Sequence, residues 1–463
     1  MGELASRLAA FLRLVRGSGS DSRFTFEELR VPSGQPKVFV GSESGAALWS
    51  SPPGRSLLDL MVSDSEYLSA FAGNWDPAAE ARMTIAGVVG SWPANGAAPE
   101  NFAEEAEADL WGSLRREEIV ASAVGIVERV QTPPEGIQLP YGRSIINPNW
   151  QLMAHAFYGV WPTFALYLPT GPYTLFIARV AVPRRFFGGI AALGFARVSL
   201  DLIPDAVWLA TGILPRLGHT VAWEEQRFPV NPPQHYPPEL PMSLGMGVID
   251  LSGLSVELTE IALRLGALAG SGSRPNIDPV TAATLFTLRS QTDAPVHSAD
   301  ATLALLQAYA AADGSLTDGE TESPSIPRRF GWLCGKTNDE SRKLRSAFEA
   351  LYKIRRELAH GRRPADSQIS RFLGQDGTPV IGEAHDLWFP VLPWDRSGDA
   401  ARHRALDMLR RLYRAWLAAT LKSRDGQLVP GLSRAQLLGL LRDAQQGDSA
   451  ALSALRQATG SWA

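Results

Sequence analysis

A proline-rich stretch at residues 231–241 separates two parts of the chain that follow different patterns. Before it, short runs of β-branched and aromatic residues alternate with Pro, Gly and Asn, which is typical of strands and turns. After it, strand signals nearly vanish and apolar residues recur at helical spacing. A chain of 463 residues is also too long for a single core. The sequence therefore predicts the α+β class, with a β-rich part followed by a helical bundle.

Four segments follow from these patterns. Residues 1–22 are expected to form an amphipathic helix and a flexible joint, and residues 23–250 a β-rich domain. Residues 251–425 should form the helical domain, and residues 426–463 a helical tail. In the β-rich part we expect antiparallel sheet, arranged as a sandwich or an open barrel, with strands at 37–40, 83–89, 164–168, 173–182, 198–202 and 220–228 and helices at 56–71 and 104–130.

Helices in the second part are predicted from apolar spacing and from capping residues. Asp278 is expected to be an N-cap followed by Pro279 at the first helical position, and Asp399 is a second candidate N-cap. Gly361 follows a long helix at the position where glycine commonly ends one. Residues 313–327 look like a polar loop. The predicted helices are 254–269, 278–291, 298–312, 338–360, 399–422, 433–444 and 449–458.

Charge and hydropathy restrict where the chain acts. The formal net charge is −4 and the sequence pI is about 6.0, so any surface that binds nucleic acid must be local. The first 17 residues lack the continuous apolar core of a signal peptide. The most apolar later stretch, 186–214, contains three charged residues and is too polar for a membrane span. We therefore expect a cytoplasmic protein that does not contact a membrane.

Motifs for metals, nucleotides and covalent catalysis are missing from the sequence. The single cysteine, Cys334, follows Trp332 and Leu333 and is expected to be a small buried hydrophobe rather than a nucleophile. The seven histidines show no metal-ligand spacing. The Gly-rich segment 41–45 lacks the Lys-Ser/Thr pair of a phosphate-binding loop. The sequence therefore predicts neither a metal nor another cofactor.

The helix predicted at 338–360 carries an unusual charge. Its apolar stripe comprises Leu344, Phe348, Leu351 and Leu358, and Arg355 lies on the same stripe, four residues after Leu351. A guanidinium group at a core-facing position is rare unless it is paired or functional. Arg355 is therefore a candidate functional residue.

His360 ends the same helix and is a candidate for proton transfer. The negative end of the helix dipole favours its charged form, whereas the neighbouring arginines oppose it, so we expect an imidazole that can both accept and donate a proton. Arg356, four residues earlier, shares its face. Arg355 lies about 140° away around the helix axis. A dimer in which two such helices cross would bring Arg355 and His360 together.

Residues 328–361 resemble the core of the ApeA-like group of the HEPN superfamily. In that group a helix contains a Leu-Tyr-x-x-Arg segment and ends in His-Gly. The matching residues, in order, are Leu351, Tyr352, Arg355, His360 and Gly361. The resemblance covers roughly residues 280–422, and a β-rich domain before the helical one is the arrangement associated with ApeA-like defence proteins.

This resemblance implies metal-independent cleavage of RNA by the Arg-x4-His motif. Arg355 and His360 would be the catalytic residues, with Tyr352 and Arg356 in supporting roles. Arg356 departs from the family, in which a polar residue, often Asn, Asp or His, follows the arginine. Basic residues around the motif would contact phosphate groups: Lys353, Arg362 and Arg363.

The resemblance also implies partners and leaves an alternative open. HEPN sites typically form across a dimer, so we expect a homodimer that cuts RNA such as tRNA, in phage defence or as a toxin, with a phage-derived or protein trigger at the N-terminal domain. The alternative is a noncatalytic dimerisation scaffold, in which Arg355 pairs with a buried carboxylate.

One basic face is expected to be ordinary exposed surface rather than an RNA platform: Arg402, Arg404, Arg410, Arg411 and Arg414.

Overall fold

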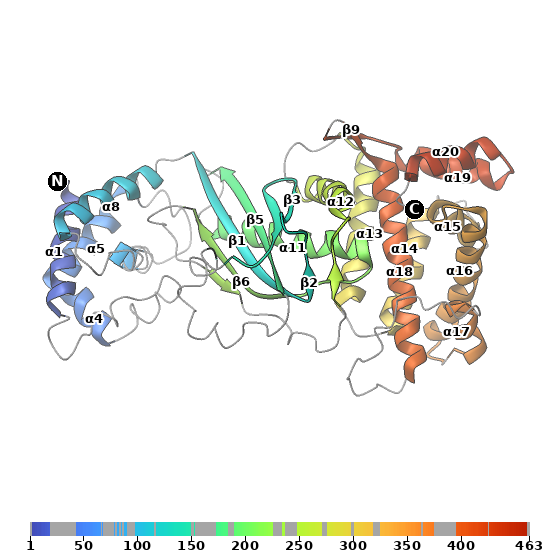
Figure 1. Ribbon diagram of the computed structural model, residues 1–463, viewed down its shortest axis with the longest axis horizontal. Helices are drawn as coiled ribbons and strands as arrows, with labels where there is room; N and C mark the ends of the chain where they lie inside the picture. Colours follow the sequence, from blue (N-terminus) through green and yellow to red (C-terminus); the bar gives the residue numbers. More distant parts are fainter. Residues whose placement is uncertain are drawn as a thin grey trace. The chain divides into compact units, whose positions relative to one another are not determined.

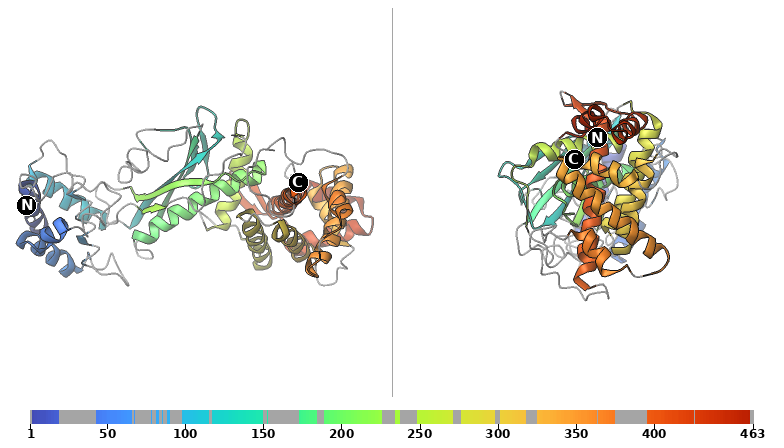
Figure 2. Two further views of the ribbon diagram at one scale, coloured as in Figure 1. Left: turned by 90° about the horizontal axis from the view of Figure 1, so that it is seen from below. Right: turned by 90° about the vertical axis from the view of Figure 1, so that its right-hand side faces the viewer.

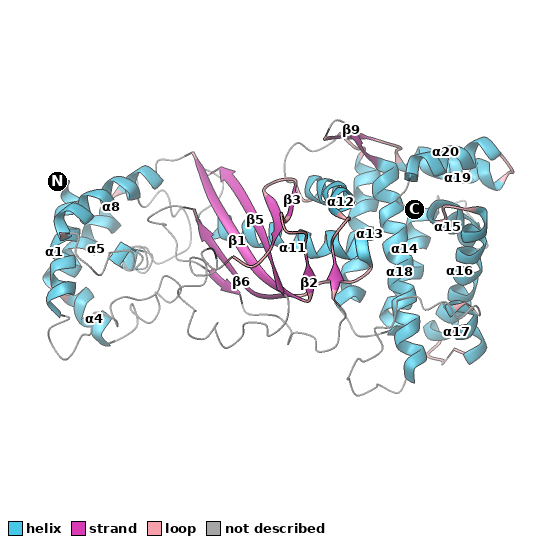
Figure 3. Ribbon diagram, viewed as in Figure 1, coloured by secondary structure: helices cyan, strands magenta, loops and turns pink. Residues whose placement is uncertain are grey.

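The computed structural model shows an α+β protein, as the sequence predicts (Figures 1 and 3). The chain divides into two compact units, of which unit 1 comprises Met1–Pro204, Pro215–Met242 and Val248–Ser255, and unit 2 comprises Asp205–Leu214, Ser243–Gly247 and Val256–Ala463. The structure describes residues 2–18, 43–65, 67, 78, 81–82, 85, 88–89, 98–114, 117–149, 152, 173–183, 189–225, 234–236, 248–270, 276–297, 301–317, 325–362, 364–374, 395–424 and 426–460.

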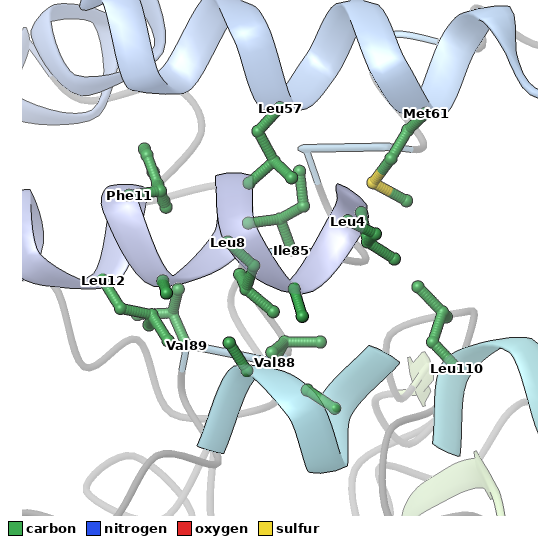
Figure 4. Packing of buried hydrophobic residues seen from close by; sticks show 14 of the residues in the cluster. Leu4, Leu8, Phe11, Leu12, Leu57, Met61, Ile85, Val88, Val89 and Leu110 are labelled. Atoms are coloured by element: carbon green, nitrogen blue, oxygen red, sulfur yellow. The ribbon is translucent and has the colours of Figure 1, made fainter. Parts of the chain in front are cut away.

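Unit 1 begins with a helical cluster. Its helices are α1 (Glu3–Ser18), α4 (Glu43–Ser50), α5 (Pro52–Ser63) and α8 (Pro99–Leu114). The N-terminal helix is confirmed, and its apolar face packs against α5 and α8 (Figure 4). The Phe11 ring stacks on that of Trp49, with 5.0 Å between their centroids. The strand expected at 83–89 is wrong at the residues that the structure describes, because Ile85, Val88 and Val89 are helical and buried in the same cluster.

A six-stranded antiparallel sheet follows in unit 1, with strand order β3-β4-β5-β1-β6-β7. Its central strand, β1 (Glu118–Glu128), pairs with β5 (Tyr173–Pro183) on one side and with β6 (Leu217–Glu224) on the other. The remaining strands of this sheet are β3 (Ile137–Leu139), β4 (Arg143–Ile146) and β7 (Gln234–Tyr236), while β2 (Val130–Gln131) pairs in parallel with β8 (Ile249–Asp250).

Two predictions for unit 1 are wrong. The helix expected at 104–130 ends at Leu114, because the following run of β-branched residues forms β1. The strand expected at 198–202 lies within α11 (Gly189–Thr211), which Figure 2 shows along one face of the sheet. A Cβ atom at Gly125 of β1 would lie 3.2 Å from a methyl group of Leu200. Because glycine has no side chain, α11 can pack closely against the sheet at this point. The expected strands at 37–40 and 164–168 lie outside the described residues.

Unit 2 is helical, as predicted, and also contains one short hairpin. The hairpin is formed by β9 (Leu421–Arg424) and β10 (Gln427–Pro430). In the part of the chain that the structure describes, no helix is both long and apolar enough to cross a membrane. The helices are α12 (Ser255–Leu268), α13 (Pro279–His297), α14 (Ala301–Leu316), α15 (Ile326–Cys334), α16 (Asn338–Ala359), α17 (Asp366–Leu373), α18 (Asp395–Thr420), α19 (Arg434–Gln445) and α20 (Ser449–Thr459).

The helix boundaries in unit 2 test the capping predictions. Asp278 caps α13 as expected, because its carboxylate accepts a hydrogen bond from the Thr281 amide at 2.9 Å. Asp399 is not an N-cap, since α18 begins four residues earlier, at Asp395. The polar loop expected at 313–327 is wrong at both ends, because α14 extends to Leu316 and α15 begins at Ile326, and residues 318–324 lie outside the described residues. Because this stretch is rich in polar residues, its sequence pattern did not indicate either helix end.

Helices α15 and α16 pack closely because one glycine leaves room for a backbone contact. A Cβ atom at Gly331 of α15 would lie 2.5 Å from the carbonyl oxygen of Ser341 in α16. Cys334, at the end of α15, is fully buried beside this contact, and burial raises the pKa of its thiol. The prediction that Cys334 is a small buried hydrophobe is therefore confirmed.

Gly331→Ala should destabilise unit 2, because the added methyl group collides with backbone that cannot rotate away. We expect a loss of about 1–3 kcal/mol in the free energy of unfolding. Gly439→Ala is the matched control, since Gly439 lies inside α19 and its Cβ position has no neighbour within 4 Å. The control should be neutral or stabilising by up to about 1 kcal/mol. Chemical denaturation of both variants would show this, and equal unfolding midpoints would contradict the close contact.

Candidate functional site

Helix α16 carries the candidate site, and local signals specify where it begins. Thr337 is its N-cap, and its hydroxyl accepts a hydrogen bond from the Glu340 amide at 3.1 Å. The Glu340 carboxylate in turn accepts one from the Lys336 amide at 3.0 Å. Asp339 and Glu340 also place negative charge at the positive end of the helix dipole.

The other end of α16 places His360 on the surface. His360 is the C-cap and Gly361 follows with φ of +68°, a conformation that glycine adopts without strain. The amides of Gly361 and Arg362 donate to the carbonyls of Leu358 and Glu357, both at 2.9 Å, which is the hydrogen-bond pattern of a Schellman motif. The expected role of Gly361 is confirmed, and the imidazole of His360 is left exposed.

Arg355 does not occupy a core-facing position, and that prediction is wrong. The buried stripe of α16 runs through Leu344, Phe348 and Leu351 and then continues to Ile354, three residues after Leu351. Arg355, four residues after Leu351, is exposed. A step of three and a step of four both follow a helix face, and the apolar residue is the one that enters the core.

The guanidinium group of Arg355 lies over an aromatic ring. Its Cζ atom is 5.0 Å from the ring centroid of Tyr309 in α14, which is a cation–π contact. Tyr309 also contacts Tyr352, with 5.8 Å between ring centroids. Arg355 forms no ion pair with any carboxylate among the described residues. The closed ion pair expected for a noncatalytic scaffold is therefore absent from this part of the chain.

The end of α16 carries three further exposed cations. Lys353, Arg356 and Arg362 are exposed, and none of them forms an ion pair within the described ranges. The first half of α16 differs, because its charged residues pair with one another: Asp339 with Arg342 and Lys343, and Arg345 with Glu349. Arg363 lies outside the described residues. The end of α16 is thus a local basic surface on a chain whose net charge is negative.

Arg355 and His360 do not meet within one copy of the chain. They lie five residues apart on one helix, which separates their directions by about 140° around its axis. No hydrogen bond or ion pair of the His360 side chain is found among the described residues. The structure thus brings Arg355 and Tyr352 together through Tyr309, and leaves His360 apart from them.

The arginines of α18 are not an exposed face, which corrects another prediction. Arg411 binds Glu340 at 2.5 Å and Asp407 at 2.9 Å, and only 26% of its side chain is exposed. Arg414 is buried and pairs with Glu257 at 2.5 Å. Arg410 donates to the carbonyl of Leu209 at 3.2 Å, at the C-terminal end of α11. These arginines hold helices together and are unavailable to RNA.

Two side-chain arrangements escaped the sequence analysis because only tertiary contacts create them. One is Tyr309, which supports Arg355 from a helix that carries no part of the motif. The other is His219 of β6 and His235 of β7, whose ring nitrogens lie 3.0 Å apart and whose pKa values are both lowered by burial. Within the described ranges, no group of three or more His, Cys, Asp or Glu residues is placed to hold a metal.

Comparison of the chain with family models, with curated proteins and with solved structures gives no match. The site is therefore interpreted from its own residues. It consists of the exposed end of α16, where Tyr352, Lys353, Arg355, Arg356, His360 and Arg362 lie within eleven positions.

Arg411 and Arg355 should differ sharply in their effect on stability. Arg411→Ala removes the ion pairs to Glu340 and to Asp407, which keeps Arg410 as a partner, and should cost about 2 kcal/mol. Arg355→Ala removes one exposed cation–π contact and should cost about 1 kcal/mol or less. Urea unfolding of the two variants measures both effects. Equal losses would mean that Arg355 is a structural residue.

The effect of Arg411→Ala on the free energy of unfolding should depend on pH. Burial alone would raise the pKa of Asp407, but the Arg411 and Arg410 guanidinium groups hold it below its usual value. A pKa that is lower in the folded state stabilises the fold above the unfolded value of about 3.9 and loses that effect as pH falls through the folded value. The difference in unfolding free energy between wild type and Arg411→Ala should therefore shrink as the pH falls below about 3.9, because a protonated Asp407 no longer gains from the Arg411 guanidinium group.

Proposed function

We propose that this chain is a metal-independent endoribonuclease of the HEPN type, with Arg355 and His360 as its catalytic residues. The observation that supports this most directly is the state of Arg355, which is exposed and forms no ion pair among the described residues. Its positive charge is thus free to act on a phosphate group. Lys353, Arg356 and Arg362 on the same end of α16 also form no ion pair among the described residues, and their charge favours a polyanionic substrate.

The chemistry follows from the two side chains. His360, as general base, takes the proton from a ribose 2′-hydroxyl, and the 2′-oxygen forms a bond to the adjacent phosphorus. The bond from phosphorus to the 5′-oxygen breaks, and that oxygen receives a proton from an imidazolium group. The planar guanidinium group of Arg355 stabilises the negative charge that develops on the phosphate oxygens. The products carry a 2′,3′-cyclic phosphate and a 5′-hydroxyl end.

A second copy of the chain would complete the site. Arg355 and His360 point in directions about 140° apart on one helix, so a single phosphate cannot readily contact both. In a twofold homodimer with crossing α16 helices, Arg355 of one copy would lie near His360 of the other. Arg356 shares a face with His360 and would contact the neighbouring phosphate. The His360 of each site would then act first as the general base and, once protonated, as the general acid.

The role in the cell follows from the resemblance to ApeA-like proteins. We propose that the enzyme acts in the cytoplasm on RNA such as tRNA, in phage defence or as a toxin. The N-terminal region would sense a phage-derived or protein trigger. The noncatalytic scaffold remains the outcome to which a negative cleavage experiment would point.

Purified wild-type protein should cut an RNA pool that includes tRNA, with or without lysate from infected cells as the source of the trigger. His360→Ala and Arg355→Ala should each lower the rate by about 100-fold or more, since each removes a group that acts in the transition state. Arg342→Ala is the control, because Arg342 lies on the same helix and is exposed but pairs with Asp339. Cleavage that is equal in all variants, or absent from wild type under every condition, would contradict the proposal.

Mixing inactive variants tests whether two copies share a site. If each site takes Arg355 from one copy and His360 from the other, a mixed dimer of Arg355→Ala and His360→Ala contains one intact site. An equimolar mixture should then recover about a quarter of the wild-type rate, because half of the dimers are mixed and each has one of two sites. If each site used both residues of one copy, the mixture would stay inactive.

A further inference from the structure

Four aromatic rings form a continuous series from the core of unit 2 to its surface. Phe330 of α15 contacts Phe348 of α16 with 5.0 Å between ring centroids, and Phe348 contacts Tyr309 of α14 at 6.0 Å. Tyr309 contacts Tyr352 at 5.8 Å. Phe330 and Phe348 are fully buried, Tyr309 is 7% exposed and Tyr352 is 40% exposed. The outermost ring is therefore held in place by a rigid interior.

The exposed ring of Tyr352 lies within the basic surface at the end of α16. Arg355 and Arg356 are three and four residues further along the helix, so their side chains neighbour that of Tyr352. Arg355 is itself fixed over the ring of Tyr309. An exposed aromatic side chain thus lies beside two cations, Arg355 and Arg356, that form no ion pair among the described residues.

We propose that Tyr352 stacks on a base of the substrate, and that this surface therefore takes unpaired rather than double-stranded RNA. The choice of RNA rests on the proposed function, whereas the choice of an unpaired segment rests on the ring. A base within a duplex has both faces covered by its neighbours and cannot stack on a side chain. A base in a single strand can do so, while the flanking phosphates meet the cations.

Two features of the surface favour this occupant over an acidic protein segment. The cations are spread over ten positions, from Lys353 to Arg362, which suits a repeating phosphate backbone. The ring of Tyr352 is anchored on one side by Tyr309 and is partly open to solvent. When a base stacks on an anchored ring, little side-chain entropy is lost. The strength of such stacking depends little on which base is bound.

Binding can be measured without cleavage in the full-length His360→Ala protein. The probes are a fluorescent 12-nucleotide single-stranded RNA and the same strand annealed to its complement, followed by anisotropy at fixed salt. We expect the single strand to bind at least about 10-fold more tightly than the duplex, and a second change, Tyr352→Ala, to abolish most of that preference. Tyr352→Phe should retain it, since the ring remains.

Phe286→Ala is the matched control, because Phe286 of α13 is also an exposed aromatic residue, at 48%. This change should leave both affinities unaltered. Circular dichroism and thermal unfolding of each variant check that the overall fold and its stability are retained. A single-stranded DNA probe separates recognition of the base and phosphates, which DNA shares, from recognition of the 2′-hydroxyl.

The outcomes separate this inference from the proposed function. If wild type cuts RNA but Tyr352→Ala binds the single strand as tightly as its parent, the stacking role is overturned and the nuclease remains. If single-stranded RNA binds through Tyr352 but wild type cuts nothing, the nuclease proposal fails and the stacking role holds. Equal affinity for the single strand and the duplex would overturn the preference for unpaired RNA.

Discussion

The packing of Phe348 between Tyr309 and Phe330 determines how α16 is turned, and the candidate site depends on that orientation. Once Phe348 points into the interior, helix geometry directs Leu351 and Ile354 inward after it. Arg355 must then emerge at the edge of the buried face, where Tyr309 supports its guanidinium group. The same hydrophobic contact thus stabilises unit 2 and presents the basic surface.

Arginine has two different roles in unit 2, and the neighbouring carboxylates decide between them. On α18, Arg411 and Arg414 are largely buried, and each is bound to an acidic residue of another helix. Such charges are neutralised locally and serve packing. At the end of α16, Arg355 and Arg356 form no ion pair among the described residues, so their charge remains available to a ligand. Counting arginines in the sequence would have favoured the wrong helix.

Local signals made some parts of the structure predictable. Thr337 and Gly361 lie at the two ends of α16, and Asp278 lies at the start of α13. These ends are predictable because capping depends on residues close in sequence. The orientation of Arg355 was not predictable, since steps of three and four both follow a helix face and only packing selects one. The strand expected at 198–202 became part of α11 because tertiary burial overrides β-branched propensity. Contacts between distant segments, such as Tyr309 with Arg355, leave no trace in spacing.

The chemistry of RNA ends in cells tests the central claim most directly. RNA from cells expressing wild type or His360→Ala would be mapped by sequencing, before and after treatment with phosphatase and kinase. The account predicts cleavage in the wild-type sample alone, with 2′,3′-cyclic phosphate and 5′-hydroxyl ends. Fragments with 3′-hydroxyl and 5′-phosphate ends, or identical RNA from both strains in the presence of the trigger, would contradict it.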